Sequence, residues 1–165
     1  MRKVIVIGCP GSGKTTFSER LRDRSGLPLY HLDAIWHKPD RSHISRDEFD
    51  ARLEEVLSGD RWIIDGHYSR TLERRIAACD TVCFFDLPVE DCLSGVLARL
   101  GKARPDVPWI DTAPDPRFQA EVEMFPSQQL PVIRELLSRY REGRTVVTFQ
   151  SREAADRWLC ETFPK

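Results

Sequence analysis

The chain has 165 residues, of which 41% are hydrophobic and 31% are charged, and its formal net charge is −1. This length and composition predict one soluble globular domain with its own core, and the slight negative charge argues against tight direct binding of DNA, because duplex-binding domains usually carry a basic footprint. No apolar run reaches the roughly 18 residues of a membrane span, and the N-terminus opens on a strand pattern, so we expect a cytoplasmic protein without membrane contact.

The first predicted strand, residues 4 to 7, runs directly into a glycine-rich turn. Gly8, four further residues, Gly13, Lys14 and Thr15 fit the phosphate-binding loop pattern G-x-x-x-x-G-K-[ST]. The glycines permit positive φ angles, so that successive N–H groups turn inward and bind a polyphosphate. Lys14 is expected to reach the outer phosphates and Thr15 to offer its hydroxyl to magnesium, at a helix N-terminus that favours negative charge. The predicted nucleotide-binding residues are Gly8, Cys9, Pro10, Gly11, Ser12, Gly13, Lys14, Thr15 and Thr16.

Helical and strand patterns alternate along the rest of the chain. Residues 14 to 24 are helical up to Gly26, and a short strand over 29 to 32 ends at Asp33. Ser45 and Glu48 have the spacing of a capping box, which predicts a helix from Ser45 to Gly59. Further strands are predicted over 61–66, 81–86 and 145–149, and helical patterns over 69–78, 88–101, around 118, 127–143 and from 151. The proline-rich stretch from 102 to 117 is predicted to be a long surface loop.

Strands that alternate with helices indicate a parallel sheet covered on both faces. We therefore predict an α/β fold of three layers with five parallel strands. Ligands of such sheets bind beyond the carboxyl ends of the strands. The polar groups that follow the strands are expected along that rim; they are residues 8–15, Asp33, Asp65, Asp86 and Gln150.

Asp65 ends the apolar run Trp62 to Ile64, in the place of the acidic residue that helps to hold magnesium in phosphate-loop proteins. A helix or turn cap is the competing interpretation of Asp65. Gly66 follows it, where many motor ATPases place a water-activating glutamate, and the sequence contains no asparagine and hence no Asn-Lys-x-Asp guanine motif. Both features favour transfer of a phosphoryl group to an acceptor other than water.

Several motifs carry a resemblance to known families. They are the loop over 8–14, His31-Leu32-Asp33, Trp62 to Ser69, Phe85 to Pro88, Arg104-Pro105-Asp106 and Ser151-Arg152-Glu153. The chain resembles adenylate kinases and, more closely and over nearly its whole length, a bacterial adenylate-kinase-related family named for DNA topology modulation. The resemblance implies a single P-loop domain over 1–165 of the nucleoside-monophosphate-kinase type. It also implies ATP and Mg²⁺ as cofactors, an acceptor-binding segment at about 34–60 and a short lid at about 101–117.

The resemblance also implies roles for single residues. In adenylate kinases the lid brings arginines onto the transferring phosphoryl group, and the matching positions are Arg99 and Arg104. Gln150 would lie near the adenine. The pattern around Asp33 resembles that of hydroxyl-phosphorylating relatives such as shikimate kinase. This resemblance implies that Asp33 orients or deprotonates an acceptor hydroxyl. The alternative is that Asp33 caps the following helix.

The acceptor site departs from adenylate kinases. Those enzymes grip the acceptor phosphate with an arginine shortly after the second strand, where this chain has Trp36, His37 and Lys38. Arg70 lies one residue later than the corresponding family arginine. Trp36, His67 and Tyr68 are predicted to form an aromatic pocket for the acceptor, with core packing as the alternative.

Two functions remain open at this point. The first is an ATP- and Mg²⁺-dependent kinase of a small acceptor, either a nucleoside monophosphate or a hydroxyl-bearing metabolite. Its metal ligands would be Thr15 and Asp65. Its catalytic residues would be Lys14, Asp33, Asp65, Arg99 and Arg104. The second is a nucleotide-binding regulator that influences DNA topology without turnover. A monomer or weak dimer is expected in either case.

Overall fold

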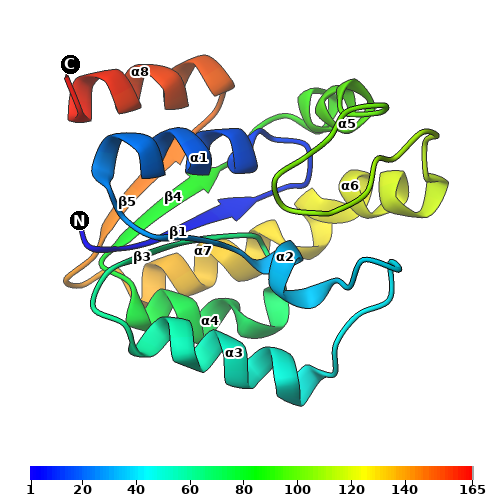
Figure 1. Cartoon of the computed structure of the whole chain (residues 1–165). Helices are drawn as coiled ribbons and strands as arrows, with labels where there is room; N and C mark the ends of the chain where they lie inside the picture. Colours follow the sequence, from blue (N-terminus) through cyan, green and yellow to red (C-terminus); the bar gives the residue numbers. More distant parts are fainter. Residues whose placement is uncertain (165) are drawn as a thin grey trace.

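The computed structural model describes residues 1–164, which form a five-stranded sheet between two layers of helices (Figure 1). The strands are β1 (Lys3–Gly8), β2 (Leu29–His31), β3 (Trp62–Asp65), β4 (Thr81–Phe85) and β5 (Thr145–Phe149), all parallel and in the order β2-β3-β1-β4-β5. Residues 4 to 7 of the central strand β1 are fully buried, because helices cover both faces of the sheet. The predicted α/β class and its five parallel strands are confirmed.

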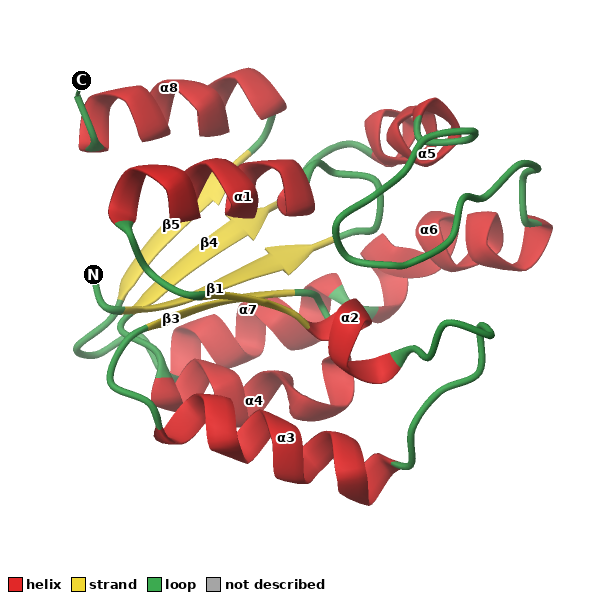
Figure 2. Cartoon of the chain, in the orientation of Figure 1, coloured by secondary structure: helices red, strands yellow, loops and turns green. Residues whose placement is uncertain are grey.

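The helices form two layers and a group at the carboxyl ends of the strands. Helices α1 (Lys14–Ser25) and α8 (Arg152–Thr162) cover one face, while α3 (Arg46–Ser58), α4 (Ser69–Ala78) and α7 (Leu130–Arg139) lie on the other (Figure 1). Helices α2 (Leu32–Trp36), α5 (Val89–Ala98) and α6 (Pro116–Gln128) lie toward the carboxyl ends, and Figure 2 shows the long loop from α5 to α6 crossing this edge of the sheet. No helix within residues 1–164 has both the length and the apolar character needed to cross a bilayer.

Local capping signals act as the sequence predicts. The Ser45 side chain accepts a hydrogen bond from the Glu48 N–H at 3.1 Å and begins α3. The Glu48 carboxylate, however, accepts from Arg52 on the exposed face, so only half of the capping box forms. Gly26 ends α1 in the left-handed conformation, with φ of 66°. A serine cap also begins the last helix, where the Ser151 side chain accepts from the Ala154 N–H.

Two boundaries differ from the sequence prediction. Strand β2 ends at His31 and α2 begins at Leu32, so Asp33 lies in the first turn of a helix and not at a strand end. The helical stretch after the lid divides at Gln129, two residues later than predicted. Pro126 and Pro131 flank this break, and neither can donate a backbone hydrogen bond to a preceding turn. The first shift places the Asp33 carboxylate above the sheet edge, on the side of the predicted site.

Candidate functional site

The phosphate-binding loop has the backbone that its glycines predict. Gly8, Gly11 and Gly13 have φ angles of 138°, 79° and 104°, and α1 begins at Lys14 immediately after them. The loop also lies directly against α5: a Cβ atom on Gly11 would come within 2.1 Å of the Cys92 carbonyl oxygen, and one on Gly95 within 2.0 Å of the Gly11 carbonyl oxygen. The two backbones therefore approach each other more closely than any larger residue allows.

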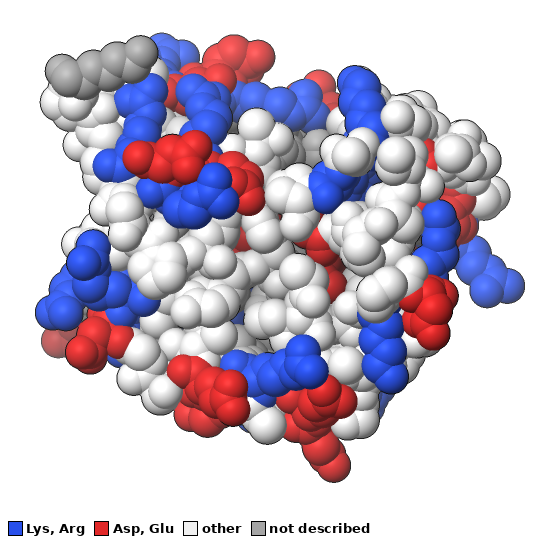
Figure 3. Space-filling view, in the orientation of Figure 1, with Lys and Arg blue, Asp and Glu red and all other residues white. Residues whose placement is uncertain are grey.

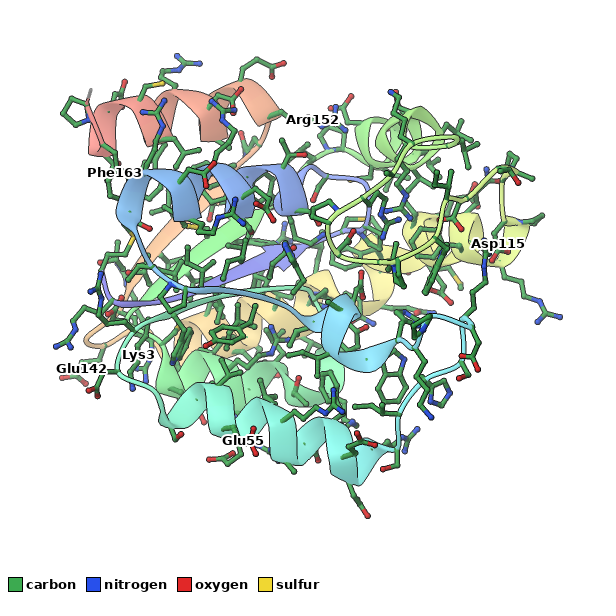
Figure 4. The ribbon with its side chains drawn as sticks, in the orientation of Figure 1. Lys3, Glu55, Asp115, Glu142, Arg152 and Phe163 are labelled. Carbon is green, nitrogen blue, oxygen red and sulfur yellow. The ribbon has the colours of Figure 1, made fainter. Side chains whose placement is uncertain are left out.

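Arg152 secures this contact from a third element. Its Nη2 donates to the carbonyl oxygens of Gly11 at 2.9 Å and of Asp91 at 2.7 Å, so one guanidinium joins α8, the loop and α5. Figure 4 shows Arg152 at the start of α8, beside α5. The loop is thus held by contacts outside itself, which keeps its N–H groups oriented without a bound anion.

A cavity of about 1280 Å³ lies at the carboxyl edge of the sheet, between the loop, the acceptor-binding segment and the lid. Most of the predicted site residues line it: Pro10, Gly11, Gly13, Lys14, Thr15, Thr16, Asp33, Asp65, His67, Tyr68, Arg99 and Arg104. The structure thus brings together residues from separate stretches of the chain. Gly8, Cys9 and Ser12 belong to the loop but face the core.

Besides Gly8, Cys9 and Ser12, three predicted residues lie outside this cavity. Trp36 and Arg70 line a separate hollow of about 270 Å³, so the predicted pocket of Trp36 with His67 does not form. Trp36 stacks on His43 with ring centroids 4.4 Å apart, and Arg70 forms a two-fold hydrogen bond with Asp50 at 2.6 and 2.9 Å. Gln150 is exposed beyond the cavity. The positions of Trp36 and Arg70 depend on contacts with His43 and Asp50, and these contacts cannot be predicted from where a residue follows a strand in the sequence.

Cys9 lies in the phosphate-binding loop but its side chain belongs to the core. Backbone N–H groups and a lysine lower the pKa of a nearby thiol, but the Cys9 side chain is only 4% exposed. A hydrogen bond with Cys92 and burial raise the pKa of Cys9 instead. The thiol is therefore a core group and not a reactive one.

Lys14 and Asp65 form the centre of the site. Lys14 is 9% exposed, and its Nζ donates to the Cys9 carbonyl oxygen at 2.6 Å. Asp65 is 4% exposed; its Oδ2 accepts from His31 Nδ1 at 2.8 Å, and its Oδ1 has no hydrogen-bond partner within residues 1–164. The other ring nitrogen of His31 lies 3.0 Å from the Glu19 carboxylate. A buried imidazole thus joins α1 to the end of β3 and orients the carboxylate.

His31 predicts a pH-dependent stability. Burial opposes its charge, but hydrogen bonds and charges from Asp65 and Glu19 outweigh burial and raise its pKa from 6.5 to about 9. Because the folded-state pKa lies above the unfolded value, protonated His31 stabilises the fold fully below pH 6.5, and this contribution disappears as the pH rises through 9.

We expect the wild type to lose about 2 kcal/mol more unfolding free energy than His31→Gln between about pH 6 and about pH 10. Urea unfolding of both proteins at the two pH values measures the difference. Parallel losses in the two proteins would contradict the ion-pair assignment.

The acceptor end of the cavity is built around Asp33 and Tyr68. The Tyr68 hydroxyl donates to Asp33 Oδ1 at 2.7 Å, and burial raises the pKa of Asp33 above its ordinary value. His67 lines the same cavity, with its Nε2 3.0 Å from the Gln129 side-chain oxygen. Burial lowers the pKa of His67 to about 4, so this ring is neutral at pH 7. The acceptor end therefore offers a carboxylate, a hydroxyl and a neutral imidazole.

Two guanidinium groups line the cavity, from Arg99 at the end of α5 and from Arg104 on the predicted lid. Arg99 lies over the Phe118 ring at 5.0 Å, and burial followed by the charge of Arg104 lowers its pKa. Arg104 donates through Nε and Nη2 to the two carboxylate oxygens of Asp106, both at 3.0 Å. Asp106 is 5% exposed, and its Oδ2 also accepts from the Thr15 hydroxyl at 3.4 Å. Asp106 was not among the predicted site residues; the signal for it was the Arg-Pro-Asp motif.

The lid also meets the acceptor-binding segment directly. The Arg41 guanidinium lies over the Trp109 ring at 5.3 Å and donates to the Ile110 carbonyl oxygen at 3.3 Å. His37 contacts the same Trp109 ring edge to face, with centroids 5.2 Å apart. The two segments that the sequence separates thus close over one cavity.

No protein-family model and no curated protein sequence matches the chain. Among solved structures, shikimate kinase from Acinetobacter baumannii in complex with shikimate has a similar fold, with a TM-score of 0.63. The match covers 98% of this chain and 93% of that chain, at 16% sequence identity. The similarity therefore shows that the chain shares the overall fold of that protein over nearly its whole length.

Proposed function

We propose that this chain is an ATP- and Mg²⁺-dependent kinase that transfers a phosphoryl group to a hydroxyl group of a small acceptor. The observation that carries the proposal is the convergence of Lys14, Thr15 and Asp65 with Arg99 and Arg104 on one cavity. Phosphoryl transfer needs little covalent help from a protein and depends on positioning and on stabilising charge, which this arrangement provides. The similar fold of shikimate kinase is consistent with this reaction class.

The residues at the loop fit a nucleotide with its metal ion. The positive φ angles of the loop glycines open an anion-binding nest, and Lys14 stands at its outer end. The free Oδ1 of buried Asp65 and the Thr15 hydroxyl are hard oxygen donors of the kind Mg²⁺ prefers. When bound, the metal would neutralise charge on the β- and γ-phosphates. Thr15 and Asp65 would hold it there.

The remaining residues have distinct tasks in the proposed reaction. Lys14 would give up its hydrogen bond to the Cys9 carbonyl and bind the outer phosphates instead. Arg99 and Arg104 would stabilise the charge on the migrating phosphoryl group. Asp33 would accept the proton of the acceptor hydroxyl, since its raised pKa brings it closer to the range of a general base. The lid would exclude water during transfer.

An uncharged hydroxyl acceptor fits the acceptor end better than a nucleoside monophosphate. The Tyr68 hydroxyl is bonded to Asp33, and His37 and neutral His67 line the same cavity. A phosphate acceptor would need a cation of its own, whereas the proposal assigns Lys14 and Arg99 to the phosphates of the nucleotide. Arg41 of the acceptor-binding segment already contacts Trp109 and the Asp111 carboxylate, the latter at 3.5 Å. The proposal thus favours the hydroxyl-bearing metabolite of the two acceptor classes.

The alternative of a DNA-topology regulator gains no support from the surface. On the face shown in Figure 3, lysines and arginines are interspersed with aspartates and glutamates, and the described residues form no continuous basic stripe across it. A duplex-binding surface needs such a stripe to contact successive phosphates.

A coupled ADP-release screen tests the proposal. The screen offers magnesium ATP with nucleoside monophosphates, nucleosides, sugars, polyols and hydroxy acids, and we expect turnover above the water background with a hydroxyl compound. Calorimetry with magnesium ATP accompanies it. No heat of association at millimolar nucleotide would refute nucleotide binding and with it the whole proposal.

Asp33 provides a prediction specific to the acceptor. Asp33→Asn is expected to lower kcat about 100-fold or more, because the amide cannot accept the hydroxyl proton. The affinity for magnesium ATP, measured by calorimetry, should stay unchanged. Asp86→Asn is the matched control, since Asp86 follows β4 of the same sheet but contacts Arg134 and does not line the cavity. Equal kcat in Asp33→Asn and wild type would contradict the assigned base.

A further inference from the structure

Asp106 places a second carboxylate at the phosphate-binding loop, from the segment after α5, whereas Asp65 ends β3. Asp106 belongs to the lid, yet it is 5% exposed, and its Oδ2 lies 3.4 Å from the Thr15 hydroxyl oxygen. Its position is fixed by Arg104, which donates two parallel hydrogen bonds to it. The lid therefore brings an oriented oxygen to the first turn of α1.

Without a ligand, this location suits a carboxylate, because the loop N–H groups and the N-terminus of α1 favour anions and the Arg104 guanidinium is paired with Asp106. Once a polyphosphate occupies the loop, its charge and that of the fixed carboxylate repel each other. A divalent cation would turn this repulsion into an attraction.

The Thr15 hydroxyl and the Asp65 carboxylate line the same cavity and are further oxygen donors for such a cation. Asp65 is only 4% exposed, and its Oδ1 lacks a hydrogen-bond partner within residues 1–164. Two oxygens on adjacent corners of a magnesium octahedron lie about 3 Å apart. The 3.4 Å between Thr15 and Asp106 is close to that separation, so both oxygens can face one ion directly or through a water.

We propose that Asp106 is a ligand, carried by the lid, for the divalent cation that accompanies the nucleotide. Thr15 and Asp65 hold the ion from the core, and Asp106 reaches it from the lid. Lid closure and metal loading are then coupled: the lid closes tightly only over a nucleotide that carries its cation. This inference rests on the proposed nucleotide binding at the phosphate loop.

Asp106→Asn tests the inference through binding and not through turnover. The probe is the non-hydrolysable β,γ-imido analogue of ATP, titrated by calorimetry once with Mn²⁺ and once with EDTA. We expect Asp106→Asn to weaken binding of the manganese-loaded analogue about tenfold and to leave binding of the metal-free analogue unchanged or tighter. Asp111→Asn is the matched control, because Asp111 also lies on the lid and also contacts Arg104, at 3.7 Å, but has no contact with Thr15 among the described residues. It should change neither affinity.

The other outcomes each overturn the inference. If Asp106 only positions Arg104, Asp106→Asn and Arg104→Gln will weaken both forms of the analogue equally. If Asp106 blocks the site, Asp106→Asn will tighten both. If the wild type binds neither form, nucleotide binding itself fails, and the proposed function fails with it.

A second measurement uses the wild type alone and remains valid if a variant does not fold. Hydrogen exchange across residues 101–111 should slow with the manganese-loaded analogue and much less with the metal-free one. Equal protection by the two forms would refute the coupling.

Discussion

Lys14→Ala is expected to lower phosphoryl transfer about a thousandfold while leaving the thermal melt of the nucleotide-free protein nearly unchanged. Without ligand, Lys14 has one hydrogen bond, to the Cys9 carbonyl, which also accepts from the Ser12 N–H at 3.3 Å. Burial lowers the pKa of Lys14, which means that the fold bears a cost in holding this ammonium group, and its removal costs little stability. Its charge is needed only when phosphates are bound.

ADP release with the acceptor found in the screen, together with differential scanning calorimetry, measures both effects. Lys38→Ala is the matched control, because Lys38 is an exposed lysine of the acceptor-binding segment and does not line the cavity. Its turnover should equal that of the wild type. Wild-type turnover in Lys14→Ala would end the kinase assignment, whereas a large fall in melting temperature would show that Lys14 is a structural residue.

The phosphate loop was predictable because all the residues of its motif lie within one short stretch of the chain. Glycines, a lysine and a hydroxyl residue at this fixed spacing are compatible with few other backbone conformations. The φ angles of Gly8, Gly11 and Gly13 are all positive, as predicted. The strands were predictable for a related reason: a parallel strand covered on both faces must be apolar nearly throughout, as residues 4–7 and 82–85 are.

The acceptor site was less predictable because its geometry depends on pairings between distant segments. Arg70 is paired with Asp50 on the surface, and half-buried Trp36 stacks on His43. No sequence pattern around Asp50 or His43 predicts either pairing. Asp106 shows the converse case. Its neighbour Arg104 was predicted from the lid resemblance, but only the folded lid shows that the carboxylate reaches Thr15, 91 positions away in the chain.

Arg75 is another residue that the sequence did not single out, and it gives the largest stability effect that we expect. It is fully buried on α4, with no carboxylate within salt-bridge distance among the described residues. Its guanidinium donates to the carbonyl oxygens of Gly66 at 2.8 Å, of Tyr68 at 3.0 Å and of His67. Burial lowers its pKa to about 9, so it remains charged at pH 7.

The three carbonyls belong to the segment that carries the acceptor-site side chains, and that segment is strained. Tyr68 has a φ of 38°, a left-handed conformation that a non-glycine residue adopts at a cost of about 1 to 3 kcal/mol. Arg75 offsets this cost by satisfying the carbonyls, and it thereby holds the Tyr68 hydroxyl on Asp33. Arg75 is thus a positioning residue for the acceptor site.

Arg75→Met is therefore expected to lower the unfolding free energy by about 3 to 5 kcal/mol, because the side-chain volume is kept while buried carbonyls lose their donor. This corresponds to a fall of about 10 °C in melting temperature for a chain of this size. Arg74→Met, on the preceding residue of the same helix, is the matched control: Arg74 is exposed and has only ion pairs at 3.8 and 4.0 Å, which contribute about 1 kcal/mol or less. Urea and thermal unfolding of the two variants measure the contrast. Equal stabilities would show that water replaces the guanidinium and that the Tyr68 segment keeps its conformation without it.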